Sequence, residues 1–501
     1  MSRVTAAAGF AVWTRGRVPT AHLAAWERRM PVLRAALGHD RVREPYGSVS
    51  EFRHQLLDVV DVADHAQVWL TLAVLTGRLP DHTTVVETAR ASEFDGAASL
   101  VRAVARGTTQ HSARWHVRVA TDEVLVDVAH TASTVLTTGI QRVARETTRR
   151  WLRDHRCTPV SWTRGFQSIR ELKPTERSRI EQATALEDVA GPADATVVVP
   201  WRATYLLPEL AAEPDRTVRL LALAELSPNR TGVIGFDCVP ITSAETTQLG
   251  FAGVFAGNLA AVRCFDRVGA ISGAAATEYS GWRATLGAIG RAGPEVRAVQ
   301  LPVDAANPAP EDVAATRARF VVGDLPLVLV VGSHEPRKNH LAVLHAAELL
   351  WREGIEFSLS FVGGNSWGSE QFTNRLGELS RSGRPVSTES RLPDQQLWAA
   401  YRLARCTLFP SLHEGFGLPV AESLAAGTPA VTSDFGSMAE IAQGGGALTV
   451  DPHDDHAIAE ALRTLLTDDA QHALLTEQAR HRTVRTWDDY ASELWTYLLD
   501  E

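Results

Sequence analysis

Lysine is nearly absent from this sequence of 501 residues, because only Lys173 and Lys338 among its 50 basic residues are lysines. So strong a preference for arginine is typical of a GC-rich coding bias. The shortage also makes the surroundings of each remaining lysine informative. Neither lysine has the G-x-x-x-x-G-K-[ST] context of a phosphate-binding loop, which excludes an ATPase of that class.

Cysteine and long apolar runs are also scarce. The cysteines are Cys157, Cys238, Cys264 and Cys406. They lie far apart with no C-x-x-C pair, so they indicate neither a zinc site nor a disulfide framework, and reduced thiols in the cytoplasm fit best. No apolar run approaches the roughly 18 residues of a membrane span. The longest early run, 6–13, is followed by Arg15 and Arg17, where a signal peptide would have its cleavage site.

Charge and motif absences narrow the function further. The formal net charge of −9 excludes a dedicated nucleic-acid binder, although it leaves room for a local basic pocket. Asp-x-Asp, which metal-dependent sugar transferases of another fold use, is missing. The run from His453 to His456 looks like a metal quartet, but its aspartates are expected as helix cap and first-turn charge. We therefore expect no metal site.

The arginine-rich segment 101–118 allows two interpretations. It either contacts a membrane surface or an acceptor lipid, or it forms a helix with solvated arginines. It lies at the end of a region, 1–118, whose apolar pattern predicts mostly helices, among them 21–37 and 68–75. Pro31 is expected to kink or split the first of these. We expect 1–118 to form a helical N-terminal extension.

From residue 119 onward, short apolar strands alternate with helices, which is typical of parallel sheets covered on both faces. A proline-rich connection separates a block 119–305 from a block 306–480, and 481–501 holds a C-terminal helix. The expected strands are 124–128, 196–200, 233–237, 264–271, 327–331, 357–362, 407–410 and 430–433. The expected helices are 141–153, 339–351, 419–426 and 487–499. The predicted fold class is α/β, with two Rossmann-like domains in tandem.

The segment HEGFGLPVAE, residues 413–422, follows an expected strand, where open α/β sheets bind ligands. Gly415 and Gly417 let the backbone approach a ligand, and the helix that follows offers its amino end to an anion. Glu414 and Glu422 are separated by seven residues. Either the two carboxylates converge on two parts of one ligand, or Glu422 is a first-turn carboxylate that the helix dipole favours.

The segment GSHEPRKN, residues 332–339, also follows an expected strand and opens a helix. Arg337 supplies a forked donor and Lys338 a compact cation, which together suit a diphosphate. The alternative is a solvated turn, but a chain that otherwise replaces lysine with arginine makes that alternative weaker.

These two segments, with RLPDQQLWAAYRLARCTLFPS (391–411) between them, resemble the donor-binding half of the retaining glycosyltransferases of family 4, the glycosyl transferases group 1 type. The resemblance is strong over about 325–470 and includes the paired-glutamate motif of the family. It implies a GT-B fold, in which two Rossmann-like domains face a cleft. It also implies that a nucleotide-sugar donor binds the second domain, that the acceptor binds the first, and that no metal or cofactor takes part.

The resemblance assigns a role to each motif residue. Arg337 and Lys338 would bind the donor diphosphate and stabilise the leaving group electrostatically. Glu414 would hold the hydroxyls of the donor sugar, and Glu422 those of the ribose. The other donor-binding residues of these loops are expected to be Gly332, Ser333, Gly415, Phe416, Gly417 and Leu418.

The N-terminal half resembles the family more weakly. Segment 127–146 is similar to the first strand, glycine loop and helix of a subset of the family, and Gly139 would let that loop approach the donor phosphate and the acceptor. GFDCVPIT is similar to a strand that usually ends in His-Asp. Phe236 stands in the histidine position, whereas Asp237 remains and would position acceptor or donor. Ser272 would face the cleft, and the C-terminal helix would pack back on the first domain.

The sequence thus predicts a cytoplasmic, metal-independent, retaining hexosyltransferase, with peripheral contact at the inner face of a membrane left open. The EPRKN form resembles members that use GDP-mannose or a related deoxyhexose donor in surface polysaccharide assembly, with a glycan or lipid-linked acceptor. Two alternatives remain open. One is a nucleotide-sugar epimerase on the same fold, and the other is a catalytically silent partner subunit, which Phe236 favours.

Overall fold

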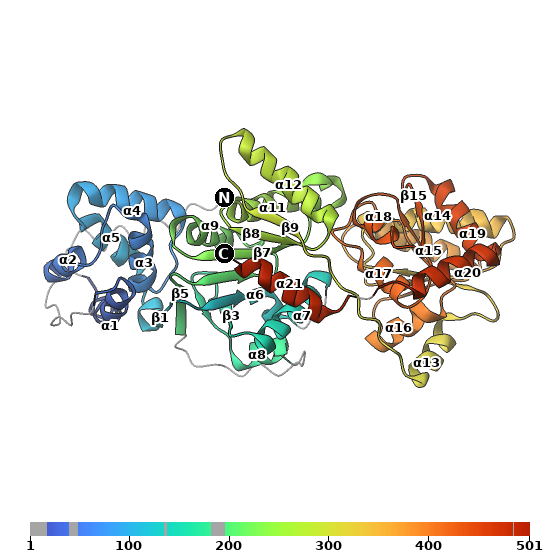
Figure 1. Ribbon diagram of the computed structural model, residues 1–501, viewed down its shortest axis with the longest axis horizontal. Coiled ribbons are helices and arrows are strands. Elements are labelled where there is room, and N and C mark those ends of the chain that lie inside the picture. The colour runs from blue at the N-terminus through green and yellow to red at the C-terminus, as the bar shows by residue number, and fades with distance from the viewer. Residues whose placement is uncertain (1–17, 40–48, 135–137, 182–195, 484, 501) are drawn as a thin grey trace.

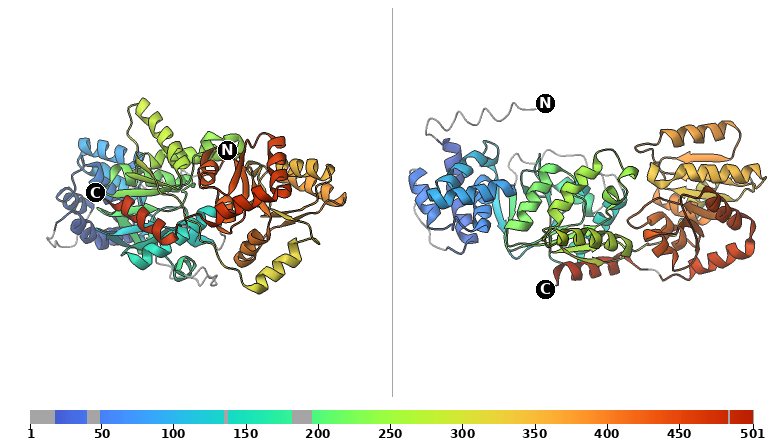
Figure 2. Two further views of the ribbon diagram at one scale, coloured as in Figure 1. Left: turned by 45° about the vertical axis from the view of Figure 1, so that its right-hand side comes forward. Right: turned by 90° about the horizontal axis from the view of Figure 1, so that it is seen from above.

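The computed structural model describes residues 18–39, 49–134, 138–181, 196–483 and 485–500. Three parts follow one another along the long axis of the molecule, namely the N-terminal helices, a first sheet domain and a second sheet domain (Figure 1). The C-terminal helix returns from the second sheet domain to the first (Figure 2). Within the described residues, no helix has both the length and the apolar character needed to cross a bilayer.

The N-terminal part is helical up to the first strand. Its helices are α1 (Thr20–Ala36), α2 (Val49–Leu57), α3 (His65–Thr76), α4 (His82–Asp95) and α5 (Ala98–Gly107). Helix α3 is buried on all sides from Val68 to Thr76, and α1, α4 and α5 pack against it. Arg29 of α1 donates to the carbonyls of Leu75 and Trp115, each at 2.9 Å. Helix α1 is not split at Pro31.

The arginine-rich segment 101–118 is not a single helix. It contains the end of α5, the short helix η2 (Ser112–Arg114) and the start of a strand at His116. Arg102 forms an ion pair with Asp95. The helix interpretation is therefore correct only for the beginning of this segment.

The first sheet domain is a nine-stranded sheet in the order β1-β5-β4-β3-β2-β6-β7-β8-β9. Its strands are β1 (His116–Ala120), β2 (Val124–Asp127), β3 (Thr158–Trp162), β4 (Ile169–Glu171), β5 (Thr196–Pro200), β6 (Thr204–Leu207), β7 (Arg230–Gly235), β8 (Arg267–Ala270) and β9 (Glu295–Ala298). Neighbouring strands run parallel, except that β4 is antiparallel to β3 and β5. The predicted boundary between residues 118 and 119 falls inside β1.

Helices cover this sheet and connect its strands. They are α6 (Ala129–Ser133), α7 (Gly139–Asp154), α8 (Pro174–Glu181), α9 (Pro214–Leu226), α10 (Val239–Thr242), η3 (Ala244–Thr246), α11 (Phe251–Val262) and α12 (Gly273–Ala288). The expected strand 264–271 was too long, because Phe265 lies in a buried turn before β8. The expected strand 233–237 begins earlier and ends at Gly235. Asp237 therefore lies in the loop at the carboxyl end of β7.

The second sheet domain is a six-stranded, entirely parallel sheet in the order β12-β11-β10-β13-β14-β15. Its strands are β10 (Leu327–Val331), β11 (Ser358–Val362), β12 (Val386–Glu389), β13 (Cys406–Phe409), β14 (Ala430–Ser433) and β15 (Ala447–Val450). Its helices are α13 (Pro310–Phe320), η4 (Pro336–Lys338), α14 (His340–Arg352), α15 (Glu370–Arg381), α16 (Asp394–Leu403), α17 (Leu418–Ala425), α18 (Gly436–Ala442), α19 (Asp455–Thr467) and α20 (Asp469–Arg480). Asp454 caps α19 through the N–H groups of His456 and Ala457, which confirms the cap interpretation. The predicted α/β class with two sheet domains is also confirmed.

The C-terminal helix α21 (Trp487–Leu499) packs on α7, β7 and β8 of the first sheet domain. Trp151 of α7 donates its indole N–H to the carbonyl of Ala491 at 2.9 Å. Leu494 is fully buried, and any side chain at Gly269 of β8 would overlap it. The absence of a side chain at Gly269 therefore allows α21 to lie directly against the sheet.

Replacing Leu494 by alanine is expected to lower the free energy of unfolding by about 2–5 kcal/mol, because it opens a cavity under α21. Urea unfolding followed by tryptophan fluorescence measures the change. Leu474→Ala on α20 is the matched control, since Leu474 is 52% exposed, and its effect should stay within about 0.5 kcal/mol. Equal effects of the two substitutions would contradict the packing of α21.

Candidate active site

The predicted site residues lie in loops at the carboxyl ends of strands from both sheets. Asp237 follows β7 of the first sheet, whereas residues 332–339 follow β10 and residues 411–417 follow β13 of the second. In open α/β folds, ligands bind in the crevice outside these strand ends. Here the crevices of two sheets face each other, so one ligand site has walls from both domains.

The loop after β10 is held in place by Asn339. This residue has a φ of +58°, in the left-handed region that asparagine tolerates. Its side-chain amide donates to the carbonyls of Pro410 at 3.2 Å and Pro452 at 2.7 Å, beyond the ends of β13 and β15. The preceding turn η4 consequently presents Arg337 and Lys338 to the loop after β13.

Glu414 in that second loop binds both cations. Its Oε2 lies 2.7 Å from Nη1 of Arg337, and its Oε1 lies 2.6 Å from Nζ of Lys338. Ser411 donates its hydroxyl to the same Oε1 at 2.6 Å. Burial alone would raise the pKa of Glu414, but Arg337 and Lys338 outweigh it and hold the pKa at about 2. Glu414 is therefore ionised over the whole physiological pH range.

The cations do not form a site of net positive charge. Arg337 also contacts Glu335, with Nη2 at 2.7 Å from Oε1, and donates to the carbonyl of His413 at 2.7 Å. Burial would lower the pKa of Arg337, but Glu414 and Glu335 raise it above its ordinary value. Two cations thus face two carboxylates. The expectation of a basic pocket is corrected, because a diphosphate here would have to exchange with Glu414.

Glu422 has partners that the sequence reading missed. It is the fifth residue of α17, beyond the first turn, so the helix-dipole interpretation is wrong. Its Oε1 accepts from Nη1 of Arg142 on α7 at 2.6 Å, and its Oε2 accepts from the hydroxyl of Tyr401 on α16 at 2.9 Å. The contact with Arg142 joins the two sheet domains. Arg142 belongs to the most specific part of the N-terminal resemblance, 138–142, and Tyr401 lies in segment 391–411, but the sequence assigned neither residue a role at Glu422.

Glycines in the motifs allow the backbones of the two domains to approach each other closely. A side chain at Gly415 would overlap the carbonyl oxygen of Phe236, so this position tolerates only glycine. Gly417 has a φ of +99° and begins α17. Gly139 is the first residue of α7, and a Cβ there would lie 3.7 Å from Leu418. Gly415 therefore lets the backbone approach the first domain. The sequence had indicated an approach to a ligand instead.

His413 adds a polar contact across the cleft. Its Nε2 lies 2.5 Å from Oε1 of Glu278 on α12, and its Nδ1 lies 2.7 Å from the hydroxyl of Ser243. The hydrogen bond with Glu278 raises the pKa of His413 against the effect of burial, and the negative charges of Asp237 and Glu414 add to the rise. His413 thus connects the two domains through Glu278 and Ser243.

The amino end of α12 makes further contacts between the domains. Ser272 is fully buried and donates its hydroxyl to the carbonyl of Gly415 at 2.6 Å, so it faces the cleft as expected. Glu440 of α18 accepts from the N–H groups of Gly273 at 3.1 Å and Ala274 at 3.0 Å. A carboxylate from the second domain thus caps a helix of the first.

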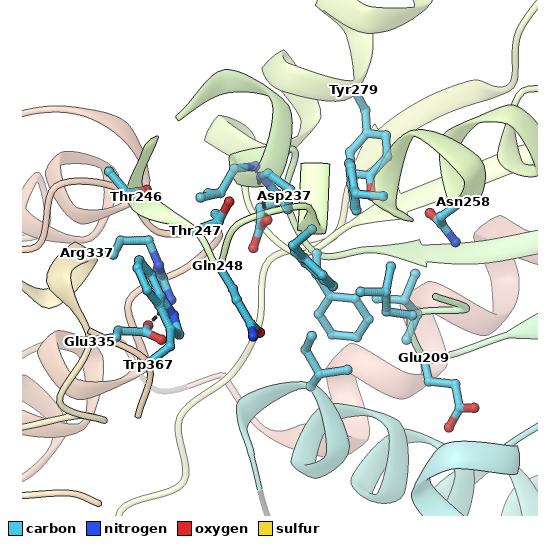
Figure 3. A pocket seen from close by; sticks show the side chains of 18 of the residues that line it. Glu209, Asp237, Thr246, Thr247, Gln248, Asn258, Tyr279, Glu335, Arg337 and Trp367 are labelled. Atoms are coloured by element: carbon cyan, nitrogen blue, oxygen red, sulfur yellow. Dashed lines mark hydrogen bonds and ion pairs between the residues drawn. The ribbon is translucent and has the colours of Figure 1, made fainter. Parts of the chain in front are cut away.

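A cavity of about 280 Å³ lies between the domains, and both Asp237 and Arg337 line it (Figure 3). Burial raises the pKa of Asp237 to about 6; Arg337 opposes the rise, and Glu278 and Glu414 add to it. The protonation of Asp237, in the wall of the cavity, therefore changes at a pH of about 6. Phe236, in the place of the usual histidine, forms part of the wall.

The remaining predicted residues are dispersed around these contacts. Gly332 directly follows β10 with a φ of +148°, and Ser333 after it is exposed. Phe416 is buried in the core shared with the first domain. Thus Arg337, Lys338, Glu414 and Asp237 gather at one place, whereas the side chain of Phe416 is buried away from them.

Two facing Rossmann-like domains with a C-terminal helix crossing back define a GT-B glycosyltransferase fold. Solved structures agree at the level of the fold. Sucrose-phosphate synthase from Thermosynechococcus elongatus has a TM-score of 0.55 and 16% identity, over 75% of this chain and 98% of its own. Anabaena HepE in complex with UDP-glucose has a TM-score of 0.56 and 13% identity, over 75% of this chain and 99% of its own.

Residues 315–482, which contain most of the second sheet domain, match the family described as glycosyl transferases group 1. O-antigen chain mannosyltransferase B of Escherichia coli is 33% identical over 149 residues, which cover 30% of this chain and 39% of that protein. D-inositol 3-phosphate glycosyltransferase of Corynebacterium glutamicum (strain R) is 32% identical over 194 residues, which cover 36% of this chain and 46% of that protein. The chain thus spans less than half the length of these curated relatives. The predicted family resemblance and GT-B fold are confirmed.

The contact between His413 and Glu278 is expected to make domain closure depend on pH. Because the pKa of His413 is raised in the folded chain, the ion pair is complete below about pH 6.5 and is lost as the pH rises through the raised value. Small-angle X-ray scattering should show a larger radius of gyration at pH 8.5 than at pH 6, and Glu278→Gln should abolish this difference.

Glu225→Gln is the control for this experiment, because it removes the carboxylate 3.4 Å from His82, away from the cleft. It should leave the pH dependence of the radius of gyration intact. A pH dependence that survives Glu278→Gln would show that another group controls closure.

Proposed function

We propose that the chain is a retaining glycosyltransferase that moves a hexose or deoxyhexose from a nucleotide-diphosphate sugar to a glycan or lipid-linked acceptor in surface polysaccharide assembly. The observation that carries the proposal is the cluster of Arg337, Lys338 and Glu414 beside the cavity between the domains. A GDP-mannose-like donor is supported by the EPRKN form and by the similarity to O-antigen chain mannosyltransferase B.

The donor diphosphate would replace the carboxylate of Glu414 at Arg337 and Lys338. Two phosphates carry more negative charge than one carboxylate, and a guanidinium binds them through two parallel hydrogen bonds. The exchange releases Glu414 for the hydroxyls of the sugar. The same two cations would stabilise the charge that develops on the departing diphosphate, so the proposed step needs no metal.

Glu422 would accept from the ribose hydroxyls while it keeps its bond to Tyr401. Its carboxylate has room for further donors, because two oxygens accept about four hydrogen bonds. Backbone N–H groups for sugar and phosphate would come from the glycine-containing loops. The residues of those loops that we assign to donor binding are Gly139, Gly332, Ser333, Gly415, Phe416, Gly417 and Leu418.

In the proposed reaction, the acceptor hydroxyl attacks the anomeric carbon from the face that the diphosphate leaves. The new bond joins the hydroxyl oxygen to that carbon, the bond to the diphosphate oxygen breaks, and the diphosphate takes the proton. Asp237 would orient the acceptor hydroxyl from the cavity wall. The family resemblance supports this front-face course.

Phe236 favours a second candidate, a catalytically silent partner subunit that docks through the N-terminal helices. The cation cluster counts against it, because a silent subunit has no need of Arg337 and Lys338 paired with a carboxylate. We also propose a cytoplasmic location, since all four cysteines are free thiols. We further propose that the protein contacts the inner face of the membrane peripherally.

Replacing Lys338 by alanine is expected to lower kcat of sugar transfer by about 100- to 1000-fold, because one of the two groups that stabilise the leaving diphosphate is lost. Glu414→Ala should also abolish most transfer. UDP-, GDP- and dTDP-sugars are tested for binding by calorimetry, and the product is followed by chromatography.

Lys173→Ala is the matched control, since it removes the other lysine of the chain, in the loop before α8. It should leave both binding and transfer unchanged. Unaltered transfer by Lys338→Ala and Glu414→Ala would show that the site is wrong. No binding of any nucleotide sugar by the unaltered chain would overturn the glycosyltransferase proposal itself.

A further inference from the structure

The cavity beside the candidate site extends into the first sheet domain and has apolar walls there. Strand β7 contributes Val233, helix α7 contributes Ile140, and helix α11 contributes Phe251 and Phe255. An apolar cavity of about 150 Å³ holds one benzene molecule. A cavity of about 280 Å³ therefore accepts a group of roughly twice that size.

Two polar groups on the far side of the cavity, Glu209 and the Asn258 amide, are already used by the protein. Glu209 accepts from the N–H groups of His130 at 2.8 Å and Thr131 at 2.9 Å, and it forms an ion pair with the fully buried Arg216 at 2.9 Å. Asn258 donates its amide at 2.9 Å to a carbonyl in the loop before α9. A sugar hydroxyl placed there would give up hydrogen bonds to water and gain few in return.

Several polar groups with free hydrogen-bonding capacity lie at the other side, next to the second domain. Asp237 uses only Oδ1 in its hydrogen bond from the N–H of Val239. Across the described residues, neither the side-chain amide of Gln248 nor the indole N–H of Trp367 has a hydrogen-bond partner. Figure 3 shows Trp367 near Arg337, opposite Glu209. The cavity is therefore polar toward the donor loops and apolar away from them.

We propose that the part of the acceptor that bears the reacting hydroxyl is a compact apolar body of about a dozen carbon atoms, an alkyl or aryl alcohol, rather than a sugar ring. The proposal rests on the proposed function and selects between its two classes of acceptor. The hydroxyl lies at Asp237, and the body fills the space toward Phe251 and Phe255. This hydroxyl oxygen bonds to the anomeric carbon, and its proton leaves with the diphosphate.

The test uses the full chain with the nucleotide sugar that binds most tightly in calorimetry. Two apolar alcohols, geraniol and 2-naphthol, are compared as acceptors with methyl α-mannoside and mannobiose. The apolar alcohols should be used with at least tenfold higher kcat/KM. Preference for geraniol would point to a lipid-like acceptor and preference for 2-naphthol to an aromatic one, and either result supports the apolar body.

Phe251→Gln places an amide in the apolar wall and should lower kcat/KM for the apolar alcohols at least tenfold, while donor binding in calorimetry stays unchanged. Leu249→Gln is the matched control, because Leu249 lies two residues away and is fully exposed. It should alter neither quantity.

Two results would overturn the inference while the proposed function stands. One is sugar transfer with preference for the glycosides, and the other is an effect of Phe251→Gln no larger than that of Leu249→Gln. Failure of the proposed function looks different, because then no nucleotide sugar binds and no acceptor of either class is used.

Discussion

The carboxylate of Glu414 is the interaction on which the two loops of the candidate site depend. Arg337, Lys338 and Ser411 all contact it, so the loop after β10 and the loop after β13 hold each other in place. Removing one partner would leave the buried charge of Glu414 partly uncompensated, which costs free energy. The two loops are therefore held in this arrangement. The same loop then carries His413 and Gly415 to the first sheet domain. The geometry of the donor cluster and the approach of the domains are thus linked through one short segment.

Several contacts across the cleft are polar, beside the apolar core that Phe416 shares with the first domain. Glu278 with His413, Arg142 with Glu422, and Glu440 with the amino end of α12 are ion pairs or charged hydrogen bonds. Polar interfaces between domains permit relative motion more readily than large apolar ones. Glu414 and Glu422, the two carboxylates proposed to bind donor, are each engaged by protein cations in the described chain. Donor binding would therefore compete with contacts that order the site, and nucleotide release would restore them.

Strong local patterns in the sequence were sufficient to predict many helices and strands of the second sheet domain. Continuous apolar runs marked β10, β13 and β14, and the glycine at 417 with the helix after it marked α17. In the first sheet domain β1, β3, β4, β6 and β9 were missed, because short strands with proline, polar or charged residues carry no distinct period. Among site residues, Arg337, Lys338 and Glu414 were recognisable from spacing. Tyr401 and Glu278 were not, since their neighbours come from distant parts of the chain.

The sequence by itself determined the α/β class, the resemblance of residues 315–482 to group 1 glycosyl transferases, and several charged residues of the candidate site, among them Arg337, Lys338 and Glu414. These depend on local periodicity and on residues close together in the chain. Only the tertiary structure decided that the two cations are neutralised by Glu335 and Glu414, and that Gly415 lies against Phe236. It also showed that Lys338, one of the two lysines, forms an ion pair with Glu414, with 2.6 Å between Nζ and Oε1. Charge balance and close approach depend on which segments meet in space, and spacing along the chain does not contain that information.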